Sequence, residues 1–367
     1  MTHQDILNNN APYAGLGFGL MRLPGAEETA RMVDMYLEAG FNYFDTAYVY
    51  GGSEEKLREA LAKRHPRESF LVSDKIPPWM ADSRAACDKI LHESLKRCGL
   101  DYFDFYLVHS LDESNERSAV SGGVYEWVAE QKKKGTVKHA GFSFHGTTEL
   151  LERVLADHPE MEFVMLQLNY ADVLRGKAGE LHEVAIKHKK PVIAMEPVKG
   201  GTLALLPPAA EAVLKAARPD LSAASWAVRY AASLPGVSCL LSGMSEIGQM
   251  QDNIKSYSPF VPVTESELSI IEQALREISA VASIPCTACN YCLADCPENI
   301  EISVCFNLYN DIKRGAADWN IQGLYDALAQ GRRAGDCTSC GSCVARCPQK
   351  LDIPGDLKTV ARHFERS

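Results

Sequence analysis

The sequence predicts an α/β protein, an eight-stranded (β/α)8 barrel of the TIM type followed by a small, mainly helical, cysteine-rich domain. Eight strand candidates alternate with helices over about 250 residues, which suits a closed barrel better than an open doubly wound sheet. The strands are nearly continuous apolar runs, as expected for parallel strands that helices cover on both faces. Nine of the twelve cysteines follow residue 285. We therefore expect the barrel in residues 1–283 and a second domain in residues 284–367.

The change between strand and helix periodicity places the barrel elements in order. The first strand is a glycine-rich run, Gly15–Gly19, and a serine cap with acidic residues in the first turn begins the helix Ser53–Lys63. The other strands are expected at Phe41–Asp45, Phe70–Lys75, Tyr102–His109, His139–Ser143, Phe163–Asn169, Pro191–Glu196 and Val237–Ser242. The other helices are expected at Glu27–Ala39, Asp82–Cys98, Gly122–Lys134, Thr147–Asp157, Gly176–His188, Ala209–Ala217, Ser222–Ser233, Glu246–Ser256 and, as a bridge to the second domain, Thr264–Ser283.

The charge pattern disfavours nucleic acid and membrane surfaces as partners. Acidic residues outnumber basic ones, 48 to 38, and no basic run exceeds Lys132–Lys134. The N-terminus lacks the basic and apolar regions of a signal peptide, and no apolar stretch reaches the roughly 20 residues that span a bilayer. Cys87, Cys98 and Cys239 follow no pattern and are expected to be buried, reduced thiols. We expect a cytoplasmic protein.

Four polar residues are expected at the carboxyl ends of three successive strands. Asp45 ends one apolar run, and Tyr50 follows on a short loop before Gly51 and Gly52. A phenol protonates an oxygen poorly at neutral pH unless a nearby cation stabilises the phenolate. Lys75 is a candidate for that cation, Asp45 for its partner, and His109 for a hydrogen bond to a substrate oxygen. Because chemistry in such barrels lies at these strand ends, the set predicts a catalytic site.

The barrel resembles the aldo-keto reductases. The resemblance covers Ala14 to Ser283 and rests on LGFGLMRL, on FDTAYVYG, on Lys75 at its strand end, and on YLVH ending at His109. It implies a nicotinamide-dependent reduction of an aldehyde or ketone, with NADH or NADPH as hydride donor and a small-molecule carbonyl as substrate. Tyr50 would be the general acid, Lys75 and Asp45 would tune it, and His109 would orient the carbonyl.

The resemblance also implies cofactor contacts at separate places in the chain. Ser143 and Gln167 would hold the carboxamide, and Met195 stands where the family often has an aromatic residue that stacks on the nicotinamide. Gly243 and Gln249 replace the lysine and arginine that grip a 2′-phosphate in relatives that prefer NADPH, so NADH is equally expected. The full set of expected contacts is Gly19, Leu20, Met21, Asp45, Ser143, Gln167, Met195, Gly243, Met244, Gln249 and Asn253. Trp79 and Met80 either wall the substrate pocket or pack their own loop.

The tail carries one pattern, CxxCxxCxxxCP, twice. This spacing is typical of 4Fe-4S clusters, and in two-cluster ferredoxins the fourth cysteine of each run serves the other cluster. The predicted ligands are Cys286, Cys289, Cys292 and Cys347 for one cluster, and Cys337, Cys340, Cys343 and Cys296 for the other. Zinc or disulfides fit the spacing less well. The tail resembles bacterial dicluster ferredoxins with a helical insert over Glu298–Asp336, in which Cys305 is expected to pack rather than bind metal.

Hydride carries two electrons, whereas each cluster passes one, and a flavin normally bridges this difference. The leading interpretation is a carbonyl reductase whose ferredoxin-like tail exchanges electrons with a redox protein partner or senses redox state. The alternative is an electron-transfer or docking protein, whose clusters are structural or exchange electrons through a bound flavin. A regulatory barrel that binds nicotinamide without turnover is a further hypothesis. The substrate, the oligomeric state and the choice between NADH and NADPH do not follow from the sequence.

Overall fold

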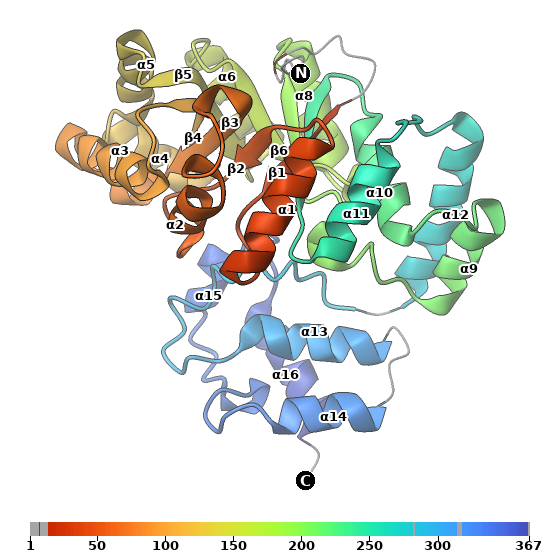
Figure 1. The fold of residues 1–367 in the computed structure, drawn as a ribbon. Coiled ribbons are helices and arrows are strands. Elements are labelled where there is room, and N and C mark those ends of the chain that lie inside the picture. The colour runs from red at the N-terminus through yellow and green to blue at the C-terminus, as the bar shows by residue number, and fades with distance from the viewer. Residues whose placement is uncertain (1–6, 8–13, 282, 314–317, 366–367) are drawn as a thin grey trace. The chain divides into compact units, whose positions relative to one another are not determined.

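The computed structural model describes residue 7 and residues 14–281, 283–313 and 318–365 (Figure 1). By compactness the chain divides into two units, Met1–Pro197 with Ala227–Val263, and Val198–Trp226 with Thr264–Ser367. The chain passes between the units after β7, within α10 (Ala223–Ala232) and between Val263 and Thr264. A division by compactness is not a division into independently folding domains. The domain boundary expected at residue 283 therefore stays a prediction.

The first unit contains the predicted barrel. Its parallel strands close in chain order from β1 to β8, and β1 pairs with β8 through Gly15 opposite Cys239 and Gly19 opposite Gly243. The strands are β1 (Gly15–Gly19), β2 (Tyr43–Asp45), β3 (Leu71–Ile76), β4 (Phe103–Leu111), β5 (Val137–Phe144), β6 (Phe163–Gln167), β7 (Val192–Met195) and β8 (Val237–Gly243). One buried apolar cluster draws on five of these strands: Tyr43, Phe105, Leu107, Phe163, Met165, Ile193, Cys239 and Leu241.

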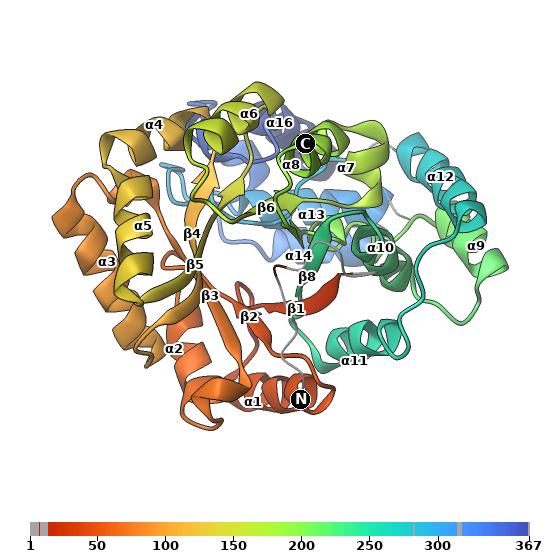
Figure 2. The ribbon, with the colours of Figure 1, turned by 90° about the horizontal axis from the view of Figure 1, so that it is seen from above.

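Helices surround these strands, and Figure 2 shows α1, α3 and α5 outside β1 to β5. The helices are α1 (Ala26–Glu38), α2 (Ser53–Leu57), α3 (Arg84–Cys98), α4 (Glu113–Ser121), α5 (Val124–Lys134), α6 (Thr148–Asp157), α7 (Tyr170–Arg175), α8 (Ala178–Lys187) and α11 (Ile247–Ser256). A π-helical turn, Arg58–Ala62, continues α2, and short 3-10 turns lie at Arg67–Ser69 and Pro78–Met80. As expected, Cys87, Cys98 and Cys239 are fully buried.

Two of these helices were not expected from the sequence, and side-chain caps account for both. The Asp112 carboxylate accepts from the backbone N–H groups of Ser114 and Asn115 and starts α4. The Asn169 amide oxygen accepts from the Asp172 N–H and starts α7. The expectation that the sixth strand reaches Asn169 is therefore wrong, because that residue already caps a helix. The fourth strand, by contrast, runs past its expected end to Leu111.

The second unit is helical. Its elements are the 3-10 turn Lys199–Gly201, α9 (Pro208–Ala217), α12 (Glu265–Ala280), α13 (Ile302–Lys313), α14 (Asp318–Asp326), the 3-10 turn Ala334–Asp336, α15 (Ser342–Arg346) and α16 (Ile353–Phe364). α9 packs on α12, and α13 packs on α16. Tyr325 stacks on Phe364 with ring centroids 4.2 Å apart, and Cys305 is fully buried in the same core, as expected. No helix in the described part of the chain has the length and apolarity to cross a membrane.

Candidate functional site

A lysine and an aspartate form a buried ion pair at the carboxyl ends of β2 and β3. The Lys75 ammonium donates to Asp45 Oδ1 at 2.5 Å and to the Thr46 carbonyl at 2.7 Å. The two side chains are 1% and 2% exposed. Strand register creates this contact, since Asp45 ends β2 and pairs with Ser73, two residues before Lys75 in β3. A buried ion pair of this kind is costly to form, which favours a functional role over a purely structural one.

The phenol and the imidazole lie against this pair. The Lys75 ammonium is 4.9 Å from the centroid of the Tyr50 ring. The rings of Tyr50 and His109 meet edge to face, with centroids 5.6 Å apart. The structure thus brings together all four side chains that the sequence analysis selected. Tyr50 is half-buried, whereas the other three are buried, so the phenol is the member of the group with most access to solvent.

Burial sets the protonation states in this group. Removal from water raises the pKa of the Asp45 carboxyl, and the neighbouring Lys75 ammonium opposes that rise. Burial lowers the pKa of His109 well below its ordinary value, and the positive charges of Lys75 and His145 lower it further. His109 is therefore a neutral imidazole at neutral pH, able to form a hydrogen bond without adding a charge.

The structure separates Trp79 from Met80, whose roles the sequence left open, and adds a residue near His109. Trp79 lies 5.7 Å from the His109 ring, between centroids, whereas Met80 is 46% exposed. Of these two loop residues, Trp79 is thus the one placed at the site. His145, which the sequence analysis did not select, acts electrostatically on His109 from the end of β5. The only available signal was its place two residues after Ser143.

Ser143 and Gln167 have hydrogen bonds that suit a carboxamide ligand. Ser143 Oγ accepts from the Ser110 N–H at 2.7 Å, so its own hydroxyl hydrogen is a donor to a second partner. Gln167 Nε2 donates to Asp172 Oδ2 at 2.8 Å, so the nitrogen end of this amide faces Asp172 and Oε1 is the acceptor for a ligand. One donor and one acceptor match the carbonyl oxygen and NH2 group of nicotinamide. The residues present therefore fit a nicotinamide cofactor.

The backbone around this pair is preorganised. Ser110 has a positive φ of 55°, at a place where the register between β4 and β5 shifts. Asn115 Nδ2 holds the Ser110 carbonyl at 2.7 Å, and Asn169 Nδ2 holds the Asp172 carboxylate at 2.8 Å. The unexpected helices α4 and α7 therefore supply the groups that orient the two expected carboxamide contacts.

The remaining expected cofactor residues lie at the ends of β1, β7 and β8. Gly19 pairs with Gly243 across β1 and β8, so two parts of the expected cofactor site are adjacent. The Leu20 N–H donates to the Asp45 carbonyl at 2.8 Å, and Met21 follows it on the same turn. Met195 ends β7 and is half-buried.

The loop and helix after β8 hold the last three expected contacts. The side chain of Met244 is buried, and Asn253 Nδ2 donates to Ser242 Oγ at 2.8 Å, so both support the loop from inside. Gln249 is exposed, and its Oε1 accepts from the Ser245 N–H at 2.8 Å. Neither Gly243 nor Gln249 carries a positive charge that could bind the 2′-phosphate of NADPH.

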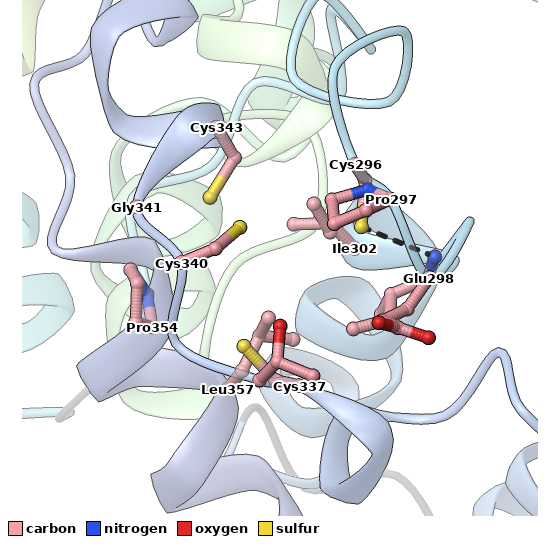
Figure 3. A pocket seen from close by; sticks show the side chains of 12 residues that line it. Cys296, Pro297, Glu298, Ile302, Cys337, Cys340, Gly341, Cys343, Pro354 and Leu357 are labelled. Atoms are coloured by element: carbon pink, nitrogen blue, oxygen red, sulfur yellow. Dashed lines mark hydrogen bonds between the residues drawn. The ribbon is translucent and has the colours of Figure 1, made fainter.

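Eight thiols of the second unit form two groups. The first, called site A, comprises Cys286, Cys289, Cys292 and Cys347, which line one pocket with Thr287, Asn290 and Ile302. The second, called site B, comprises Cys296, Cys337, Cys340 and Cys343, which line another pocket. In Figure 3 the sulfur atoms of Cys337, Cys340 and Cys343 turn toward the space that Cys296 faces. These are the two expected ligand sets, with the fourth cysteines exchanged between the runs.

Electrostatic contacts reproduce the same grouping. Burial raises the pKa of Cys292 to about 12, and the thiols that raise it further are Cys289, Cys286 and Cys347. Burial raises the pKa of Cys343, and the thiols that act on it are Cys337, Cys296 and Cys340. Four thiols this close repel one another as thiolates, and binding iron relieves that repulsion. The donor sets therefore fit 4Fe-4S clusters.

The segment that follows β7 packs on the ligand loop of site A. Gly200 has a φ of 62°, and a Cβ placed there would lie 2.5 Å from the backbone of Thr287. Thr287 is 1% exposed and stands between Cys286 and Cys289. The neighbouring Gly201 also has a positive φ, 100°, but has open space around its Cα hydrogens. Only a glycine at position 200 allows this close backbone approach.

A closed eight-stranded barrel with these four side chains at its strand ends defines a barrel protein with a candidate catalytic site, joined to a unit with two groups of four thiols. Comparison with protein families agrees: residues 15–276 match the aldo/keto reductase family, and residues 285–351 match the 4Fe-4S dicluster domain. The chain belongs to the aldo/keto reductase family, with a dicluster domain at its C-terminal side.

Individual relatives support the barrel assignment. An aldo-keto reductase of Mycobacterium avium is 31% identical over 198 residues, which are 54% of this chain and 66% of the relative. The chain thus spans slightly less than two thirds of that protein. The uncharacterized oxidoreductase YqkF of Bacillus subtilis is 25% identical over 71% of this chain and 92% of its own length.

Two solved structures show the same fold. The holo form of an aldo-keto reductase from Bacillus halodurans is 24% identical, with a TM-score of 0.58 over 71% of this chain and 91% of its own. An aldo/keto reductase from Klebsiella pneumoniae in complex with NADP and acetate is 22% identical, with a TM-score of 0.60 over 71% and 90%.

Proposed function

We propose that this protein uses NADH or NADPH to reduce the carbonyl of a small aldehyde or ketone to an alcohol. The observation that carries the proposal is the buried Lys75–Asp45 pair, with the ammonium 4.9 Å from the centroid of the Tyr50 ring. When bound, the nicotinamide supplies the hydride. This chain's own residues supply the proton and hold both reactants.

Tyr50 is the proposed general acid. The Lys75 ammonium stabilises the phenolate that remains after the proton leaves, and Asp45 keeps that ammonium in place. Neutral His109 donates a hydrogen bond to the carbonyl oxygen, which increases the positive character of the carbonyl carbon. The Trp79 ring lies beside this imidazole, with ring centroids 5.7 Å apart. Ser143 and Gln167 hold the carboxamide, which sets the face of the nicotinamide ring that meets the substrate.

We further propose that sites A and B each hold a 4Fe-4S cluster and that this module exchanges single electrons with a redox protein partner. The two pockets, each lined by four thiols, support this assignment. Because hydride transfer moves two electrons together, exchange between the module and the nicotinamide requires a flavin, on this protein or on its partner. The buried, unpaired early cysteines suit a reducing compartment, and we assign the protein to the cytoplasm.

The Tyr50→Phe variant tests the reductase proposal. Loss of a general acid should lower the rate of carbonyl reduction by about 10² to 10⁴-fold, while nicotinamide affinity stays unchanged. Tyr48→Phe is the matched control, since Tyr48 lies on the same loop and donates to Glu93 at 2.7 Å. Full activity of Tyr50→Phe in a screen of aldehydes and ketones would contradict the assignment.

Iron and sulfide analysis of anaerobically purified protein tests the cluster assignment. We expect about eight irons and eight sulfides per chain. Bleaching of the cluster absorbance by NADH or NADPH would show electronic contact between nicotinamide and clusters. Oxidised clusters in the presence of nicotinamide would favour the alternative, a structural or partner-specific module. An iron content near four would contradict the assignment of two clusters.

A further inference from the structure

The two cysteine runs differ between their second and third cysteines. In the first run the residues between the second and third cysteines are Asn290 and Tyr291, and in the second run they are Gly341 and Ser342. Position by position, Ser342 therefore corresponds to Tyr291. A serine hydroxyl lies next to the backbone, whereas the tyrosine hydroxyl is at the far end of a ring. The two sites are thus chemically unequal despite identical cysteine spacing.

The Ser342 hydroxyl lies within hydrogen-bonding distance of a cluster ligand. Cys340 Sγ and Ser342 Oγ are 3.6 Å apart, with the thiol as donor to the hydroxyl. A ligand thiolate has no proton, so in the loaded protein the hydroxyl would become the donor and the sulfur the acceptor. Ser342 is the first residue of α15, and Gly341 before it has a φ of 77°, so the hydroxyl is held on the ligand loop itself.

One pair of backbone donors is the same in both sites. The Ala288 N–H donates to Cys286 Sγ at 3.4 Å, and the Ser339 N–H donates to Cys337 Sγ at the same distance. These are equivalent positions of the two runs. Site B is marked by two further features: hydrogen bonds to its sulfurs from the Ser342 hydroxyl and from the Ile300 N–H, which donates to Cys296 Sγ at 3.5 Å, and the exposure of Cys340. Its counterpart in site A, Cys289, is half-buried.

Both differences act on the reduction potential in the same direction. Reduction adds negative charge to a cluster, and that charge spreads onto its sulfur ligands. A hydrogen bond to a ligand sulfur and contact with water each stabilise the added charge, and each raises the reduction potential.

We propose that the site B cluster has the higher reduction potential of the two and that the Ser342 hydroxyl raises it. The inference rests on the proposal that both sites hold 4Fe-4S clusters. The first electron to enter the module then resides at site B, where Cys340 is exposed. A one-electron carrier protein would accordingly exchange electrons with the module at this exposed ligand.

The test is a reductive titration of the full, cluster-loaded protein, followed by absorbance and electron paramagnetic resonance. In Ser342→Ala, the cluster with the higher midpoint should become harder to reduce. At the wild-type midpoint its ratio of reduced to oxidised form should fall by about two- to tenfold, the effect of losing one hydrogen bond. The second midpoint should not move. Ser342→Thr, which keeps the hydroxyl, should restore the wild-type value.

Ser339→Ala is the matched control. It removes a hydroxyl from the same ligand loop but keeps the backbone N–H that bonds to Cys337, so both midpoints should stay in place. Unchanged midpoints in Ser342→Ala, or an equal shift in Ser339→Ala, would overturn the inference. Iron analysis of each variant separates these results from cluster loss. A wild-type protein without two clusters would refute the underlying assignment instead.

Discussion

Replacing Lys75 by methionine removes the positive partner of a carboxylate that is 2% exposed. The Asp45 carboxyl then loses the hydrogen bond of 2.5 Å from Nζ and the positive charge that lowers its pKa. Removing one partner of a buried ion pair costs about 3 to 5 kcal/mol of stability. We expect the free energy of unfolding of Lys75→Met to fall by this amount near pH 8.

The same variant should acquire a pH dependence of known sign. Burial raises the pKa of Asp45 in the folded protein, and without Lys75 only the smaller effect of the Ser73 hydroxyl opposes that rise. Above about pH 3.9 the unfolded chain releases the Asp45 proton, whereas the folded variant retains it. The folded state then binds more protons, so its stability falls as pH rises, by about 1.4 kcal/mol per unit, until the raised pKa is passed. The variant should therefore be closest to wild type at pH 5.

Urea unfolding of the loaded, full-length protein between pH 5 and pH 8, followed by circular dichroism, measures both effects. The double variant Asp45→Asn with Lys75→Met is the control, because it removes both charges and leaves no titrating group. It should recover most of the lost stability and show no added pH slope. A double variant less stable than Lys75→Met, or a single variant with the wild-type pH slope, would refute the reasoning.

Three further predictions follow from the site contacts. His109 has a lowered pKa, so below about pH 6.5 the unfolded chain binds a proton that the folded protein does not, and the free energy of unfolding should rise with pH in that window. In urea unfolding, His109→Gln should flatten this slope by up to about 1.4 kcal/mol per pH unit. An unchanged slope would contradict the prediction. Asp172→Asn allows the Gln167 amide to rotate, so nicotinamide affinity in a fluorescence titration should fall by about two- to tenfold. Wild-type affinity would mean that Asp172 does not orient the Gln167 amide. Gly200→Ala forces a methyl group to within 2.5 Å of the ligand-loop backbone of site A, so iron analysis should show about half the iron lost. The control Gly201→Ala, which has a positive φ but open space around it, should retain all of the iron. Equal iron contents in the two variants would contradict the prediction.

The repeating part of the fold could be read from the sequence because local patterns carry it. Continuous apolar runs mark strands that are buried on both faces, and all eight were expected near their observed positions. The short polar helix α4 and the six-residue α7 were missed, because a single capping side chain starts each one and neither has a clear apolar stripe. Because the two helices were missed, Asn115 and Asp172 were missed as well. These residues orient the Ser110 carbonyl and the Gln167 amide.

The candidate site divides in the same way. Residue type and order selected the four side chains at the strand ends and the eight cysteines, because metal and acid chemistry need particular groups at particular spacings. The choice of Trp79 over Met80, the end of the Gln167 amide that faces a ligand, and the exposure of Cys340 came only from the tertiary structure. Each of these depends on a neighbour distant in the chain or on access to water, and no local pattern records either one. That Val198–Trp226 belongs to the second unit also came only from the tertiary structure. Here a backbone contact between Gly200 and Thr287 joins segments that are 87 residues apart in the chain.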